Sequence, residues 1–156
     1  MNEKPTQVAT AYHEAGHAVA ALFLGRAVQR VSIEPVQMRL GRCELQKGRF
    51  KPTQDLLETE VLILLAGPAA EARHTGRYDW NSAAQDLRDV RRLTQQRAAS
   101  LRQVEKLERR LLDKTEYILE RPGVWEAVER IASELLEHTT ISGRAARHLF
   151  DELTSQ

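Results

Sequence analysis

The sequence AYHEAGHA, residues 11–18, lies inside a stretch of helical periodicity that covers residues 6–24. Apolar side chains recur there at steps of three and four, and the opposite face is also apolar or small, so the spacing predicts a helix buried on all sides. Between residues 9 and 25 the ionisable side chains, apart from one tyrosine, are His13, Glu14 and His17. Because charged groups inside an apolar helix need partners, these three are the first candidates for chemistry.

His13 and His17 are four residues apart, so both imidazoles stand on one face of the predicted helix, one turn from each other. Two imidazoles at this spacing can bind one Zn²⁺ at about 2.0–2.1 Å. Glu14 is placed to take a proton from a water molecule that the zinc activates, as a general base. Chance is the competing interpretation, but an unpartnered carboxylate would be costly to bury at this position, which favours the metal.

A zinc hydrolase needs a third protein ligand and an open fourth position. The extended motif H-E-x-x-H-x-x-G-x-x-H fails here, since Ala20 and Phe23 stand at its glycine and third histidine positions. The third ligand must therefore come from further along the chain. The candidates are Glu71, His74, Asp79 and Asp86. Solvated surface is the simpler interpretation of His74 and Asp79, while the residue pattern leaves the choice between the other two open.

Glycines and prolines divide the rest of the chain into short elements that predict a mainly α domain with a small β element. Alternating apolar and polar residues predict short strands at 28–34 and 41–46. Further helices bring the expected total to about six, at residues 54–74, 82–98, 101–120, 124–138 and 143–153. Ser82 is expected to open the third helix through a capping box with Gln85, and Ser142 to cap the last helix.

Composition limits the classes of protein. The 156 residues, 42% of them hydrophobic, are expected to form a single domain, residues 1–156. A net charge of +1 excludes an acidic or basic disordered tail protein. Nucleic-acid binding by residues 88–114 is disfavoured because no aromatic residues interleave with their basic side chains. The basic stretch 88–114 and the acidic stretch 116–137 favour antiparallel helices of opposite charge, or solvated faces.

One cysteine, Cys43, excludes a disulfide framework and fits a cytoplasmic location. Without a P-loop or a bilayer-length apolar run, no ATPase and no membrane anchor are expected.

Four segments together resemble the FtsH-type metallopeptidases, the proteolytic half of membrane-anchored AAA proteases. They are AYHEAGHA at residues 11–18, LLAGPAAEA at 64–72, SAAQDL at 82–87 and LLEHTTISG at 135–143. They occur in the family's order and extend over most of the chain.

This resemblance implies a zincin-like FtsH-type peptidase fold in which Zn²⁺ is held by His13 and His17. It implies Asp86 as the third ligand, because this residue occupies the family's Asn-Asp aspartate position. Glu14 is then the catalytic base, and Glu71 orients a ligand or its surroundings.

We therefore expect a stand-alone zinc metalloendopeptidase, cytoplasmic and independent of ATP, that hydrolyses peptides or unfolded proteins with a zinc-activated water. An extended substrate is expected to pair with the strand near residues 41–46. The alternative is a catalytically weak or inactive metal-binding interaction module derived from such a peptidase, since the motor is missing and the stretch from Gln96 to Glu105 is shorter than in the family. The expected partners are the substrate and either further copies of the chain or a larger protease, with no nucleic acid.

Overall fold

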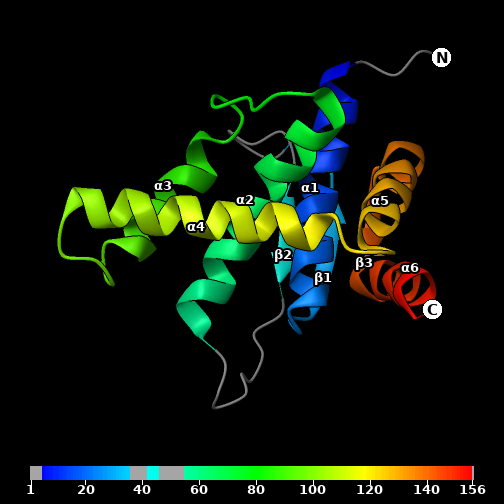
Figure 1. Ribbon diagram of the computed structural model, residues 1–156. Helices are drawn as coiled ribbons and strands as arrows, with labels where there is room; N and C mark the ends of the chain where they lie inside the picture. Colours follow the sequence, from blue (N-terminus) through cyan, green and yellow to red (C-terminus); the bar gives the residue numbers. More distant parts are fainter. Residues whose placement is uncertain (1–4, 36–41, 46–54, 156) are drawn as a thin grey trace.

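The computed structural model describes residues 5–35, 42–45 and 55–155. This part of the chain forms six helices and a three-stranded sheet (Figure 1). The elements are α1 (Pro5–Phe23), β1 (Val28–Ser32), β2 (Arg42–Leu45), α2 (Leu56–Thr75), α3 (Ala84–Thr94), α4 (Leu101–Leu119), α5 (Val124–His138), β3 (Thr140–Ser142) and α6 (Gly143–Thr154). The predicted mainly α architecture with a small β element is confirmed.

Helix α1 lies at the centre of the fold. It packs against α2 and α5 and also contacts β1 and β2, and Figure 1 shows it between α2 and α5 with α4 crossing in front. Every residue from 11 to 22 except Tyr12 is buried, which confirms the prediction of a helix covered on all sides. The approach to α2 is close, because a Cβ added at Gly16 would lie 2.4 Å from the carbonyl oxygen of Ala66.

The sheet has the order β2-β1-β3, and both pairings are antiparallel. In the middle strand, Val31 is fully buried and stands opposite Cys43 on one side and Ile141 on the other. Strand β3 was not expected from the sequence. It is three residues long and leads directly into α6, so the sheet edge and the last helix are built from one continuous segment. Strand β2 forms the opposite edge of the sheet.

The two predicted serine caps have different outcomes. Ser142 caps α6 as predicted, with its hydroxyl accepting a hydrogen bond from the backbone N–H of Ala145 at 3.0 Å. The capping box at Ser82 is wrong, because α3 begins only at residue 84 and its N-cap, Ala83, makes no side-chain bond. The hydroxyl of Ser82 is instead directed at the carboxylate of Glu71. Helix α3 is also shorter than expected.

Of the two arrangements expected for the basic stretch 88–114 and the acidic stretch 116–137, antiparallel pairing of the two is not found among the described residues, whereas most basic side chains of residues 88–114 are exposed, as expected for a solvated face. Helix α4 lies against α2 and α3 and makes little contact with α5. Its ion pairs follow that packing: Arg91 of α3 pairs with Glu108, and Lys114 pairs with Glu58 of α2. No helix within the described ranges is both long enough and apolar enough to cross a membrane.

Candidate metal centre and catalytic site

Three side chains from two helices meet beside the centre of the fold. His13 and His17 project from α1, and Asp86 from the first turn of α3. The Oδ2 atom of Asp86 lies 2.8 Å from Nε2 of His13 and 3.3 Å from Nε2 of His17. The potential ligand atoms of all three residues lie within 4.8 Å of one another. Residues far apart in the sequence are thus brought into one donor cluster.

The outer nitrogen of each imidazole is held by its own acceptor. Nδ1 of His17 donates to the backbone carbonyl of Ile63 at 2.8 Å, and Nδ1 of His13 donates to Oε1 of Glu71 at 2.9 Å. A carbonyl oxygen can only accept, so the proton of a neutral His17 ring lies on Nδ1 and its Nε2 lone pair faces the cluster. His13 differs, because its Nδ1 faces Glu71 while its Nε2 lies 2.8 Å from Oδ2 of Asp86, so a carboxylate oxygen lies at each nitrogen.

Gly67 of α2 provides the space that both imidazoles need. A Cβ built on this residue would lie 2.3 Å from Nε2 of His17 and 2.8 Å from Nε2 of His13. Real Cβ atoms do not approach other atoms so closely, so any larger side chain would displace the rings. The helix continues through the following Pro68 without interruption, and so keeps Gly67, Ile63 and Glu71 on one rigid element.

The electrostatics of the cluster favour bound positive charge. Burial by itself would lower the pKa of His13, but the hydrogen bonds to Asp86 and Glu71 outweigh it and raise that pKa to about 10. Burial also opposes protonation of His17, yet the charge of Asp86 raises its pKa as well. Although burial disfavours the carboxylate of Asp86, the two imidazoles hold the pKa of that group well below its usual range. A proton or a metal ion can supply the positive charge, and the two compete.

The donor set and its spacing fit Zn²⁺. Zinc binds imidazole nitrogen and carboxylate oxygen at about 2.0–2.2 Å, which in a tetrahedral site separates the donors by roughly 3.3 Å. The observed separations from Asp86 are 2.8 and 3.3 Å. Three protein ligands would leave a fourth position for water or substrate, as in hydrolytic zinc sites.

Glu14 is the single acidic residue of α1, and it is buried. It is 7% exposed, and its negative charge contributes to the raised pKa of both His13 and His17. Burial raises the pKa of the Cys43 thiol, and the negative charge of Glu14 raises it further. Strand β2, which carries Cys43, packs against α1.

The other candidate ligands have different partners. The ring of His74 is stacked on Tyr12, with ring centroids 3.9 Å apart and planes 7° from parallel. Asp79 accepts hydrogen bonds from the backbone N–H groups of Asn81 and Ser82, so it shapes the connection between α2 and α3. Of the four candidates, the structure brings Asp86 to the two imidazole Nε2 atoms and Glu71 to the outer nitrogen of His13.

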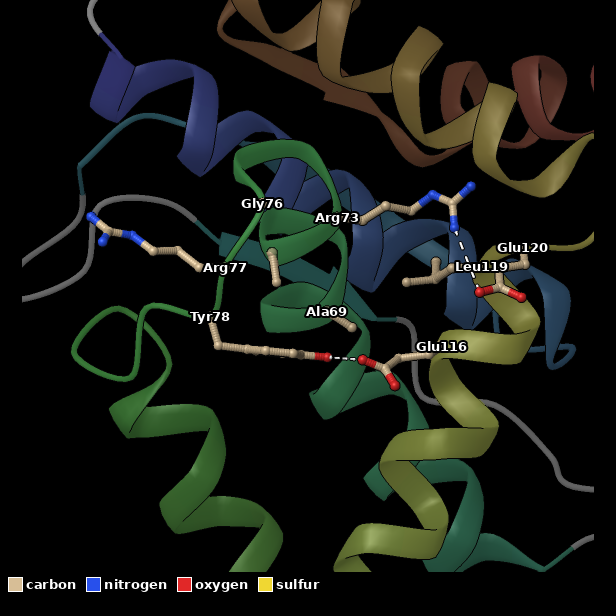
Figure 2. A pocket seen from close by; sticks show the side chains of 9 residues that line it. Ala69, Arg73, Gly76, Arg77, Tyr78, Glu116, Leu119 and Glu120 are labelled. Atoms are coloured by element: carbon tan, nitrogen blue, oxygen red, sulfur yellow. Dashed lines mark hydrogen bonds and ion pairs between the residues drawn. The ribbon is translucent and has the colours of Figure 1, made fainter.

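A separate cavity of about 320 Å³ opens between α2 and α4. Figure 2 shows two polar contacts across it, from the Tyr78 hydroxyl to Glu116 and from Arg73 to Glu120. None of the donor residues lines this cavity. It is therefore not part of the metal cluster.

Sequence reasoning missed three contributors to the site. The carbonyl of Ile63 cannot be identified from residue type, because every residue carries one. Gly67 could have been noticed as a glycine within an apolar helical segment, a pattern that often marks close approach of a neighbour. Ser82 was recognised, but as a helix cap.

Comparison with known proteins identifies the family of the chain. The family description that matches residues 1–103 is peptidase family M41. The m-AAA protease component AFG3L1 of the mitochondrial inner membrane of Mus musculus is 37% identical over 109 residues, which cover 64% of this chain and 13% of the relative. An ATP-dependent zinc metalloprotease FtsH of Protochlamydia amoebophila is 38% identical over 98 residues, 60% of this chain and 10% of the relative. The chain thus spans only about a tenth of the length of these relatives. With the family description covering well over half of its residues, the chain belongs to peptidase family M41 and contains an FtsH-type peptidase domain.

Proposed function

We propose that this chain is a zinc-dependent metalloendopeptidase in which His13, His17 and Asp86 hold the metal. The observation that carries the proposal is the convergence of two imidazole Nε2 atoms and one carboxylate oxygen beside a buried glutamate. Relatives named as zinc metalloproteases support the choice of metal and reaction. The proposal includes peptides or unfolded proteins as substrates and a cytoplasmic location.

Each residue then has a distinct task. Zinc in this position would polarise the scissile carbonyl and lower the pKa of a water molecule toward about 7. Glu14, a buried carboxylate one residue from His13, would serve as the general base for the attacking water and as the proton donor to the leaving amine. Glu71 and the Ile63 carbonyl fix the tautomer and orientation of the two imidazoles. The edge strand β2 offers backbone groups with which an extended substrate could pair.

The test compares wild type with Glu14→Gln. Both proteins are reconstituted with zinc, their metal content is measured, and digestion of an unfolded protein such as casein is followed without ATP. We expect equal zinc content and a loss of at least about a hundredfold in hydrolysis for Glu14→Gln, the amount that general-base catalysis typically supplies. A wild type that binds no zinc contradicts the proposal.

Zinc binding without hydrolysis in either protein would instead support the alternative, an inactive metal-binding interaction module. In that case the partner is a larger protease or another copy of the chain, and it should be recovered by affinity capture on the metal-loaded protein. Hydrolysis by wild type that Glu14→Gln loses excludes this alternative.

A further inference from the structure

The hydroxyl of Ser82 reaches the carboxylate that holds His13. Its Oγ lies 3.1 Å from Oε1 and 3.0 Å from Oε2 of Glu71, and 3.1 Å from the backbone oxygen of Asp79. The single hydroxyl proton can thus be donated to either carboxylate oxygen or to the loop. Oε1 of Glu71 is also the atom that accepts from Nδ1 of His13. A continuous chain of contacts runs from Ser82 through Glu71 to His13.

The loop that carries Ser82 is held by Asp79 and by Tyr78. Oδ1 of Asp79 accepts from the backbone N–H of Asn81 at 3.0 Å and from that of Ser82 at 3.3 Å. Just before this turn, the hydroxyl of Tyr78 donates to Glu116 of α4 at 2.6 Å, as Figure 2 shows. The position of Ser82 is therefore set by the loop itself and by α4, independently of the carboxylate to which it donates.

Glu71 depends on such a donor. It is 5% exposed, and a buried carboxylate is stabilised only by the hydrogen bonds that it accepts. With His13 as a donor at one oxygen, the carboxylate can still turn about its last side-chain bond. A second donor in contact with both oxygens limits that rotation, so the acceptor stays in line with Nδ1 of His13.

We propose that Ser82 is a positioning residue for the metal site, which acts through Glu71 to hold the imidazole of His13 with its Nε2 atom facing Asp86. This inference rests on the proposed zinc function. It assigns to Ser82 a role in metal affinity, beyond that of a residue in a loop.

The experiment measures the zinc dissociation constant by competition with a chromophoric chelator. Removal of a direct partner of a ligand typically weakens metal binding by about tenfold to a hundredfold. Ser82 is one contact further out, so we expect Ser82→Ala to bind zinc about threefold to tenfold more weakly. Ser82→Thr, which keeps the hydroxyl, should bind like wild type. Ser82→Gly also removes the hydroxyl but leaves no methyl group in its place, so its zinc affinity should match that of Ser82→Ala.

Ser100→Ala is the matched control, because the Ser100 hydroxyl accepts from the Gln103 backbone at the start of α4 and is not part of the site. Its loss should lower stability by about 1 kcal/mol and leave zinc affinity unchanged. A second readout is the exchange rate of the Nδ1 proton of His13, observed by NMR in the zinc-loaded protein. This rate should rise in Ser82→Ala and stay unchanged in Ser100→Ala.

The outcomes separate the two proposals. If wild type binds no zinc, the proposed function itself fails. If wild type binds zinc and Ser82→Ala binds it equally well, the role of Ser82 is refuted and the proposed function stands. A loss of affinity that Ser82→Thr shares, or that Ser100→Ala reproduces, also refutes it, since the hydroxyl–carboxylate contact would not be the cause.

Discussion

Gly67 stands where α2 comes closest to the two imidazoles of α1. Because a Cβ there would lie 2.3 Å from Nε2 of His17, Gly67→Ala is expected to push the rings apart. Overpacking of this kind typically costs about 1–3 kcal/mol, and zinc affinity should fall with it. A zinc titration measures the loss of affinity, and urea unfolding of the metal-free protein measures the loss of stability.

Gly76, at the end of the same helix, provides the control. Its φ of +97° is unfavourable for alanine, but the space around it is open. Gly76→Ala should therefore lower stability by about 1–2 kcal/mol and leave zinc affinity as in wild type. Equal zinc affinity in Gly67→Ala and wild type would contradict the role assigned to Gly67.

His13 makes the stability of the metal-free protein depend on pH. Its pKa is about 10 in the folded state, compared with an ordinary value of 6.5, so the folded state holds this proton more tightly than the unfolded chain. The stabilising contribution is complete below about pH 6.5 and is lost as the pH rises toward about 10.

Urea unfolding in the presence of a chelator, at about pH 6, 8 and 10, tests this dependence. Asp86→Asn is the comparison, because it removes the principal hydrogen-bond partner that raises the pKa of His13. Its stability should fall less over the same pH range. If the stability of the wild type falls no more between about pH 6 and 10 than that of Asp86→Asn, the raised pKa of His13 is contradicted.

The sequence indicated part of the site because that part lies on one helix. The spacing of His13 and His17 places them on one face of the helix. Glu14 could be predicted as the general base because it lies next to His13 on a buried helix. The residue pattern could not choose Asp86 over Glu71, since both are acidic residues in apolar or small-residue surroundings, and only the resemblance separated them. The contributions of Ile63 and Gly67 depend on how α2 lies against α1, which no local pattern encodes.

At the scale of elements, α3 and α4 are joined by one carboxylate. Glu108 of α4 accepts two hydrogen bonds of 2.9 Å from Arg91 and one of 2.7 Å from Thr94, which is fully buried. Burial disfavours the charged form, but these donors lower the pKa of Glu108. Because α3 carries Asp86, this connection also supports the metal cluster.

Glu108→Gln is expected to lower the free energy of unfolding by about 1 kcal/mol at neutral pH. The lowered pKa means that the contribution of Glu108 is present above its unfolded value and is lost in acid, so the difference between variant and wild type should shrink as the pH falls below about 4.5. Urea unfolding at neutral pH and below about pH 4.5 measures this difference. Asp113→Asn is the control, since its partner Arg109 is 79% exposed and such pairs contribute little; equal losses in the two variants would contradict the prediction.

The helices could be predicted from the sequence because their apolar periodicity and their stop signals agree. Residues 124–138 match the predicted helix at both ends. Strand β3 was missed because alternation over three residues is too short to be recognised in the sequence, and it is the pairing with β1 that identifies these residues as a strand. The third helix was placed too early because Ser82 has the residue type of a cap, whereas the competing acceptor, Glu71, lies on a different helix.

At the scale of the whole molecule, zinc would join α1 to α3 and should stabilise the folded chain. At a zinc concentration about a hundred times the dissociation constant, the expected gain is about 2.7 kcal/mol. Thermal unfolding with zinc, with chelator and after zinc is restored measures the gain, which should be largely lost in Asp86→Asn. An equal gain in Asp86→Asn would show that the metal binds elsewhere.

The donor cluster draws on α1 and on α3, which are separated in the sequence by β1, β2 and α2. A ribosome therefore completes both histidines long before it adds Asp86. Until that aspartate has emerged and α3 has docked, the nascent polypeptide has two of its three donors and no complete centre. Synthesis order thus delays assembly of the donor cluster until α3 has been made.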